Sequence, residues 1–113
     1  MSRRLLALGL LGALVSTPVL AQSCDTRFTF RNASNVTVNE FYFGPSANRN
    51  WGRDRLGDGV LPSGRQISFN PGGSGGNYDF RVVWANGETA ELMRVNICQA
   101  SEIIATNSGI EAR

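Results

Sequence analysis

Tyr78 to Ile97 reads YDFRVVWANGETAELMRVNI, and this stretch decides the fold. Apolar and polar residues alternate on both sides of Asn86-Gly87, which is typical of two half-buried strands. Asn and Gly both accept positive φ, so an Asn-Gly pair between such strands predicts a hairpin with a two-residue turn. We therefore predict that residues 78–85 and 88–97 pair as an antiparallel hairpin.

The two-residue turn also fixes the predicted register, because residues directly across the hairpin share a face. The predicted pairs are Trp84 with Thr89, Val82 with Glu91, Phe80 with Met93, and Tyr78 with Val95. The face expected in the core carries Tyr78, Phe80, Val82, Trp84, Met93, Val95 and Ile97. On the other face, Asp79 is expected across from Arg94 and near Arg81, either as a cross-strand charge pair or as a binding pocket.

Shorter strand patterns flank this hairpin. Residues 27–31 alternate strictly, and residues 36–43 form a second strand with a bulge near Asn39-Glu40, because their apolar phase switches there. Residues 65–70 are expected to point Ile67 and Phe69 inward, and residues 102–106 form a short last strand.

These patterns define one domain. Six to seven short strands with turns between them, and no helix of normal length, predict an all-β fold, a small antiparallel β-sandwich that is Ig-like or similar. The expected domain covers residues 22–107, and residues 108–113 are expected as a C-terminal tail.

The first 21 residues have the pattern of a signal peptide. Arg3 and Arg4 precede an apolar run from Leu5 to Val15, and Val19-Leu20-Ala21 is an A-x-A-like cleavage site. The apolar run has about 11 residues, whereas a membrane-spanning helix needs roughly 20. We therefore expect export to the periplasm or the exterior without a membrane anchor; the general and twin-arginine routes both fit, and lipidation of Cys24 is a less favoured alternative.

Composition narrows the possible partners and chemistry. The chain has 11 Lys+Arg and 9 Asp+Glu, and loss of Arg3 and Arg4 with the signal peptide leaves nine of each. A net charge of zero gives no electrostatic drive toward nucleic acid. The sequence contains no histidine and no lysine, so serine nucleophiles lack an ordinary base and zinc lacks imidazole ligands. We expect a non-enzymatic protein; a small hydrolase working with two carboxylates is the least favoured alternative.

Two cysteines, Cys24 and Cys98, make an even pair in an exported chain. Such a pair predicts a disulfide on parity alone, and a reactive free thiol is the alternative. Closing a loop of this length contributes about 4 kcal/mol in the chain-entropy model.

Residues 46–64 form a long loop, and loops of this length are usually functional or packed on themselves. Its candidate contacts for a protein or glycan partner are Asn48, Asn50, Trp51 and Arg53, because aromatic and arginine side chains are enriched at interface hot spots. The alternative places Trp51 as a plug at one end of the sandwich.

The same loop carries a second hypothesis. Asp54 and Asp58 lie four residues apart near glycines and offer the oxygen ligands that Ca²⁺ prefers, so a calcium-stabilised domain that uses the 48–58 loop is the alternative function. The other interpretation is that both aspartates cap turns and pair with arginines.

The motifs Trp51-Gly52-x-Asp54-x-Leu56-Gly57, Leu61-Pro62-x-Gly64 and Tyr78-Asp79-x-Arg81 together resemble a family of small, largely uncharacterised exported bacterial β-domain proteins. Some members carry names that refer to the Tat pathway. The resemblance implies a β-sandwich-like fold and export, and it implies no activity. Relatives often have a cysteine just before the Tyr-Asp pair, where this chain has Asn77.

Overall fold

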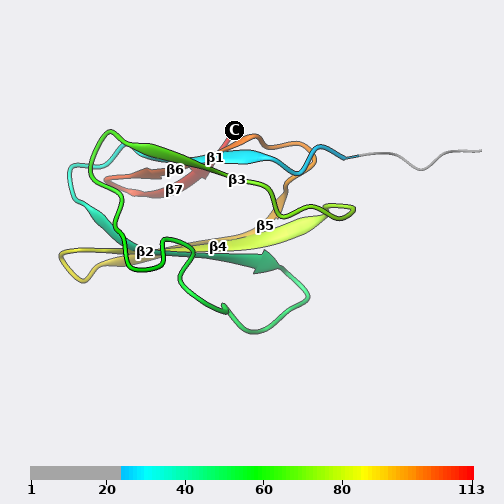
Figure 1. Cartoon of the computed structure of the whole chain (residues 1–113), viewed down its shortest axis with the longest axis horizontal. Helices are drawn as coiled ribbons and strands as arrows, with labels where there is room; N and C mark the ends of the chain where they lie inside the picture. Colours follow the sequence, from blue (N-terminus) through cyan, green and yellow to red (C-terminus); the bar gives the residue numbers. More distant parts are fainter. Residues whose placement is uncertain (1–23) are drawn as a thin grey trace, which may run out of the picture.

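The computed structural model describes residues 24–113, so the predicted signal peptide lies outside the described residues. Seven strands form two sheets that pack face to face as the two layers of Figure 1. The four-stranded sheet has the order β3-β1-β6-β7 and the three-stranded sheet the order β2-β4-β5. The strands are β1 (Phe28–Asn32), β2 (Val38–Pro45), β3 (Gln66–Phe69), β4 (Asn77–Trp84), β5 (Thr89–Asn96), β6 (Glu102–Thr106) and β7 (Gly109–Ala112).

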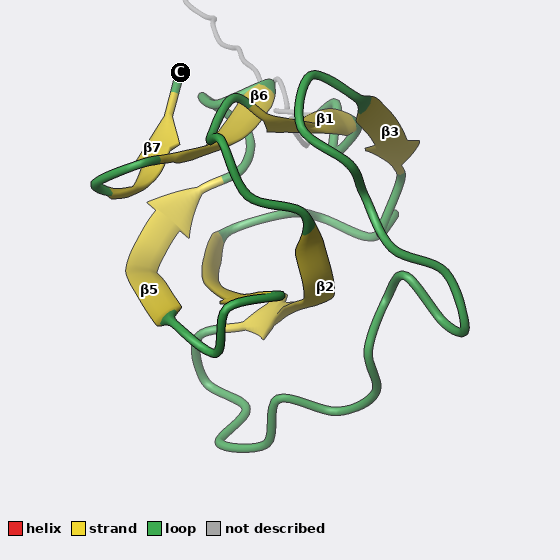
Figure 2. Cartoon of the chain, turned by 90° about the vertical axis from the view of Figure 1, so that its left-hand side faces the viewer, coloured by secondary structure: helices red, strands yellow, loops and turns green. Residues whose placement is uncertain are grey.

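The architecture confirms the predicted all-β sandwich with six to seven strands. All neighbouring strands are antiparallel except β1 and β6, which are parallel. The expected tail is wrong in part, because β7 pairs with β6 after a turn at residues 107–108. β7 also lies beside β5, so the two sheets approach each other along one edge of the sandwich (Figure 2).

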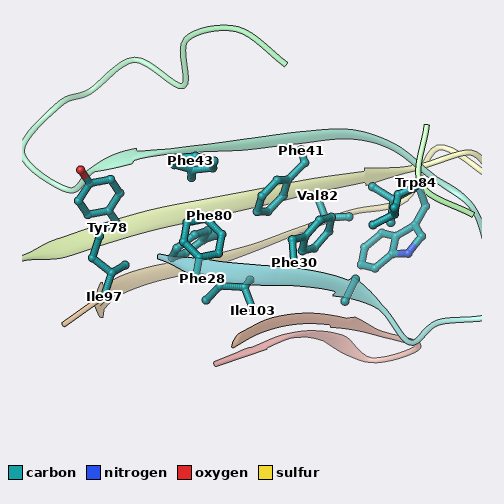
Figure 3. Close-up of a cluster of buried hydrophobic side chains, with 13 residues drawn as sticks. Phe28, Phe30, Phe41, Phe43, Tyr78, Phe80, Val82, Trp84, Ile97 and Ile103 are labelled. Atoms are coloured by element: carbon teal, nitrogen blue, oxygen red, sulfur yellow. The ribbon is translucent and has the colours of Figure 1, made fainter. Parts of the chain in front are cut away.

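An aromatic core holds the two sheets together. Phe30 of β1 stacks on Phe41 of β2 with a centroid separation of 3.7 Å, and Phe28 meets Phe43 edge-on at 5.1 Å. Figure 3 shows these rings between the sheets, with Trp84 at one end and Tyr78 beside Ile97 at the other. Burying each such side chain contributes about 1.5–3 kcal/mol, so the phenylalanines of β1 and β2 account for much of the driving force.

Buried polar atoms at the Trp84 end are satisfied. The Trp84 indole Nε1–H donates to Ser34 Oγ at 2.9 Å, and Ser34 Oγ in turn donates to Asn32 Oδ1 at 2.6 Å. The Asn32 amide donates to the carbonyls of Val36 and Leu61. The network fixes the Asn32–Val36 turn against β4, because an unpaired buried donor costs about 1–3 kcal/mol.

The hairpin forms, but its predicted register is wrong near the turn. Trp84 N–H donates to Glu88 C=O at 2.9 Å, so the turn contains three residues, with Gly87 at φ 90°. The pairs are therefore Val82 with Ala90 and Phe80 with Leu92. Met93, predicted in the core, is 51% exposed.

A bulge on β5 then shifts the register by one residue, because Met93 and Arg94 together lie across from Asp79 of β4. Beyond it, the predicted pair of Tyr78 with Val95 forms, and Ile97 is buried as expected.

Two further local predictions can be compared with the structure. The bulge in β2 is confirmed, since the register shifts between Val38 and Glu40. Phe69 packs against the core as expected. Ile67 lies across from buried Phe30 but is 37% exposed, because β3 is an edge strand of its sheet.

The predicted disulfide is confirmed. Cys24 is bonded to Cys98, with a Cα–Cα distance of 5.2 Å, and no free cysteine occurs among residues 24–113. Gly75, at φ 81°, lies against this bond, and a Cβ built there would stand 2.5 Å from both sulfur atoms. The glycine-rich loop can therefore cover the disulfide only with a residue that lacks a side chain at this position.

Candidate functional site

The second half of the long loop covers the free edge of β2. Asp54 Oδ1 accepts hydrogen bonds from the backbone N–H groups of Phe41 at 3.0 Å and Leu56 at 2.9 Å. Arg55 N–H donates to Phe41 C=O, and its guanidinium donates to Phe43 C=O and lies 4.2 Å from the centroid of that ring. These contacts occupy backbone groups that an edge strand would otherwise present to another chain.

The first half of the loop borders a groove on the outer face of the three-stranded sheet. Ser46 N–H donates to Asn77 C=O at 2.8 Å, and Asn48 N–H donates to Pro45 C=O at 2.9 Å, so the loop leaves β2 in a fixed direction. In Figure 1 it swings out beyond that sheet, on the side away from β1 and β3. The groove has a volume of about 500 Å³ and is lined by Gly44, Ser46, Ala47, Asn48, Arg49, Asn50, Trp51, Asp79, Glu91, Met93 and Arg94.

Gly44 and Asp79 lie opposite each other on β2 and β4 at the groove. A Cβ added at Gly44 would meet no atom within 4 Å, so the space above this residue is open. Gly44 does not have positive φ, which means that its backbone conformation does not itself require glycine. The absent side chain therefore keeps the groove open.

The β5 side of the groove is shaped by the bulge. Asp79 Oδ1 accepts hydrogen bonds from Arg94 N–H at 2.9 Å and from Ser46 Oγ at 2.7 Å. Arg94 has φ 60°, the one non-glycine residue with positive φ among residues 24–113. A residue held in this region costs of order 1–3 kcal/mol, and such residues cluster at functional sites.

The groove presents apolar and positively charged groups side by side. Trp51 is half-buried and Met93 is 51% exposed. Within the described part of the chain, the side chains of Arg49 and Arg94 make no hydrogen bond or ion pair. Glu91, in contrast, is paired with Arg81 at 2.7 Å.

The structure brings together three of the four predicted contact residues. Asn48, Asn50 and Trp51 line the groove, whereas Arg53 is exposed elsewhere in the loop. Trp51 lies outside the hydrophobic core cluster, so it does not plug the end of the sandwich.

Asp79 and Arg94 do not form the predicted charge pair between their side chains. Asp79 binds the backbone of Arg94, and the salt bridge on this face joins Arg81 to Glu91. Met93 was predicted in the core, and no role was predicted for Gly44. The only signal for this part of the groove was the trio of Asp79, Arg81 and Arg94. Neither the three-residue turn that turns Met93 outward nor the bulge at Arg94 has a clear sequence pattern.

The two aspartates of the calcium hypothesis are in different environments. Asp54 is partly buried and its Oδ1 already accepts two backbone hydrogen bonds, while Asp58 is exposed. Within residues 24–113, no three His, Cys, Asp or Glu side chains come close enough together to hold a metal ion.

The described residues contain no helix long and apolar enough to cross a membrane. Comparison of the chain with protein-family models, curated proteins and solved structures found no match. The resemblance to small exported β-domain proteins therefore stays a prediction.

Proposed function

We propose that this protein is an exported, non-enzymatic binding module whose groove receives a segment of another macromolecule in the periplasm or outside the cell. The observation that carries the proposal is the open groove between the Ser46–Trp51 segment and the outer face of β4 and β5. Concave sites that combine apolar walls with a few polar groups are the usual places for ligands.

The backbone at the groove supports a binding role. Arg94 is kept at positive φ by a hydrogen bond to Asp79, and the same carboxylate holds Ser46 at the start of the loop. One side chain thus joins both walls of the groove. Preorganised walls reduce the entropy lost on binding. This gain can offset the strain of about 1–3 kcal/mol at Arg94.

Compartment and chemistry support the remaining parts of the proposal. The Cys24–Cys98 disulfide is a bond that persists in oxidising compartments, and residues 1–21 have the pattern of a signal peptide. The sequence has neither histidine nor lysine to serve as an ordinary base for a nucleophile.

Gly44→Leu tests the proposal, because a leucine there fills the groove without positive-φ strain. The mature protein, residues 22–113, is screened against a peptide array and a glycan array. We expect some ligands to bind the wild-type protein and Arg53→Ala but not Gly44→Leu or Trp51→Ala. Circular dichroism should show that all four proteins are equally folded. Ligand profiles that are identical for wild type and Gly44→Leu would overturn the groove as the binding site.

A further inference from the structure

The groove is lined by two arginines and two carboxylates, and among residues 24–113 the two arginine side chains are the charged groups left without a partner. Both of its carboxylates are engaged within the protein, Asp79 by Ser46 Oγ and Arg94 N–H, and Glu91 by the guanidinium of Arg81. Arg49 and Arg94 have no such partner among residues 24–113. Two guanidinium groups are therefore available to a ligand, and each can bind a carboxylate with paired, charge-assisted hydrogen bonds.

The groove also offers apolar surface next to these charges. Met93 is one of three large hydrophobic residues that are exposed among residues 24–113, and it is the only one of the three that lines the groove. Trp51 adds a half-buried indole on the loop side. A ligand that pairs with the arginines can therefore bury an apolar group between the indole and the thioether, which is worth about 0.8 kcal/mol per buried CH₂.

We infer that the partner is an acidic polypeptide segment that carries an aromatic or aliphatic side chain beside its carboxylates. This inference rests on the proposed binding function and specifies the ligand of the same groove. Aromatic residues, Met and Arg are the types enriched where proteins bind proteins, and Trp51, Met93, Arg49 and Arg94 are of these types. The flexible side chain of Met93 can adapt to varied apolar side chains, which favours a polypeptide over a glycan as the partner.

The test uses a peptide array in which net charge and aromatic content are varied independently, with acidic oligogalacturonides as the glycan probe. We expect wild-type protein to bind acidic peptides that contain an aromatic or aliphatic residue, and to bind them more weakly as salt is raised. Arg49→Gln should weaken binding about tenfold or more, because it removes a charge-assisted hydrogen bond.

Two matched variants separate local from general effects of charge. Arg53→Gln makes the same charge change in the same loop but outside the groove, so it should change the affinity less than about threefold. Arg94→Asn removes the second guanidinium with a residue that tolerates positive φ, so it should weaken binding like Arg49→Gln while the protein stays folded.

Each other outcome overturns a defined part of the account. If neutral or basic peptides bind as tightly as acidic ones, and this binding is lost in Gly44→Leu, the inference of an acidic partner is wrong. The groove then remains the binding site. If the protein binds oligogalacturonides more tightly than every peptide, the inference that the partner is a polypeptide is wrong. Acidic peptides bound equally by wild type and Gly44→Leu would overturn the inference and the proposed function together.

Discussion

Asp79 Oδ1 accepts a hydrogen bond from the backbone N–H of Arg94 at 2.9 Å, and this contact holds the bulge at which β5 changes register. On the turn side of the bulge, Leu92 lies across from Phe80; beyond it, Val95 lies across from Tyr78. The extra residue leaves Met93 and Arg94 at the groove. The bulge in β5 and the proposed binding surface thus depend on one carboxylate, that of Asp79.

Arg94→Gly should leave the free energy of unfolding unchanged or raise it by up to about 1 kcal/mol. Glycine adopts φ 60° without the steric cost that arginine carries, and this gain offsets its larger chain entropy. Met93→Gly, one residue earlier and without positive φ, should lower the free energy by about 1 kcal/mol. Urea unfolding of the mature proteins measures both, and a larger loss for Arg94→Gly than for Met93→Gly would contradict a strained Arg94.

Asp54→Ala should lower the free energy of unfolding by about 1–3 kcal/mol, because the N–H groups of Phe41 and Leu56 lose their acceptor. Asp58→Ala, in the exposed part of the same loop, should stay within about 0.5 kcal/mol of wild type. Equal effects of the two substitutions in thermal or urea unfolding would show that Asp54 does not anchor the loop.

The same two residues decide the calcium alternative. We expect the wild-type melting temperature to be equal in calcium and in EDTA, since Asp54 holds the loop through backbone hydrogen bonds. A ligand of the folded state at a hundredfold excess over its Kd stabilises by about 2.7 kcal/mol. A rise of that size in calcium that is lost in Asp58→Asn would assign the 48–58 loop to a cation.

Gly75→Ala should destabilise the protein by about 1–3 kcal/mol more than Gly73→Ala. Both glycines have positive φ, so both substitutions strain the backbone, but only the Cβ at Gly75 collides with Cys24 and Cys98. In a Cys24→Ala/Cys98→Ala background, the difference between the two variants should shrink because the sulfur atoms are gone. A difference of the same size in that background would mean that the disulfide is not what Gly75 accommodates.

The sequence and the structure agree where local rules determine the result. The alternation of apolar and polar residues predicted strands β1 and β4, and the phase switch in β2 predicted its bulge. The even number of cysteines predicted the disulfide between Cys24 and Cys98. The predicted register near Asn86-Gly87 was wrong because this pair also fits a three-residue turn that includes Ala85 and has Gly87 at positive φ.

The groove was predicted only in part for a related reason. Trp51 and its neighbouring asparagines were predicted only as candidate contacts in the loop, and the sheet side of the groove depends on long-range contacts. The bulge needs Asp79 to bind a backbone amide 15 residues away, and no composition rule specifies that contact. Gly44 was not predicted to have a role in a site, although its missing side chain opens the groove.

Glu40→Gln should lower the pKa of Tyr42. The Tyr42 hydroxyl donates to the Glu40 carboxylate at 2.6 Å; this bond, with smaller effects of burial and negative charge, raises the pKa of Tyr42 above its ordinary value. The protonated phenol makes the bond, so its contribution to stability is present at neutral pH and is lost as pH rises through the pKa of folded Tyr42.

Absorbance titration of the tyrosinate band measures this change. The chain has two tyrosines, and only Tyr42 contacts Glu40, so the difference between wild type and Glu40→Gln belongs to Tyr42. An unchanged midpoint, or one that moves to higher pH in the variant, would contradict the hydrogen bond as the cause.

The most direct test of the groove's character needs no partner. Trp51 is half-buried beside Arg49 and near Arg94, whereas Trp84, the other tryptophan, is 7% exposed in the core. Fluorescence of mature wild type minus that of Trp51→Phe isolates Trp51, and quenching by iodide is compared with quenching by caesium at equal ionic strength. We predict that iodide quenches Trp51 more strongly, and that Arg49→Gln combined with Arg94→Asn removes this preference. Trp51 fluorescence that resists both ions, or that caesium quenches as well as iodide does, would contradict an open groove with two unpaired arginines beside Trp51.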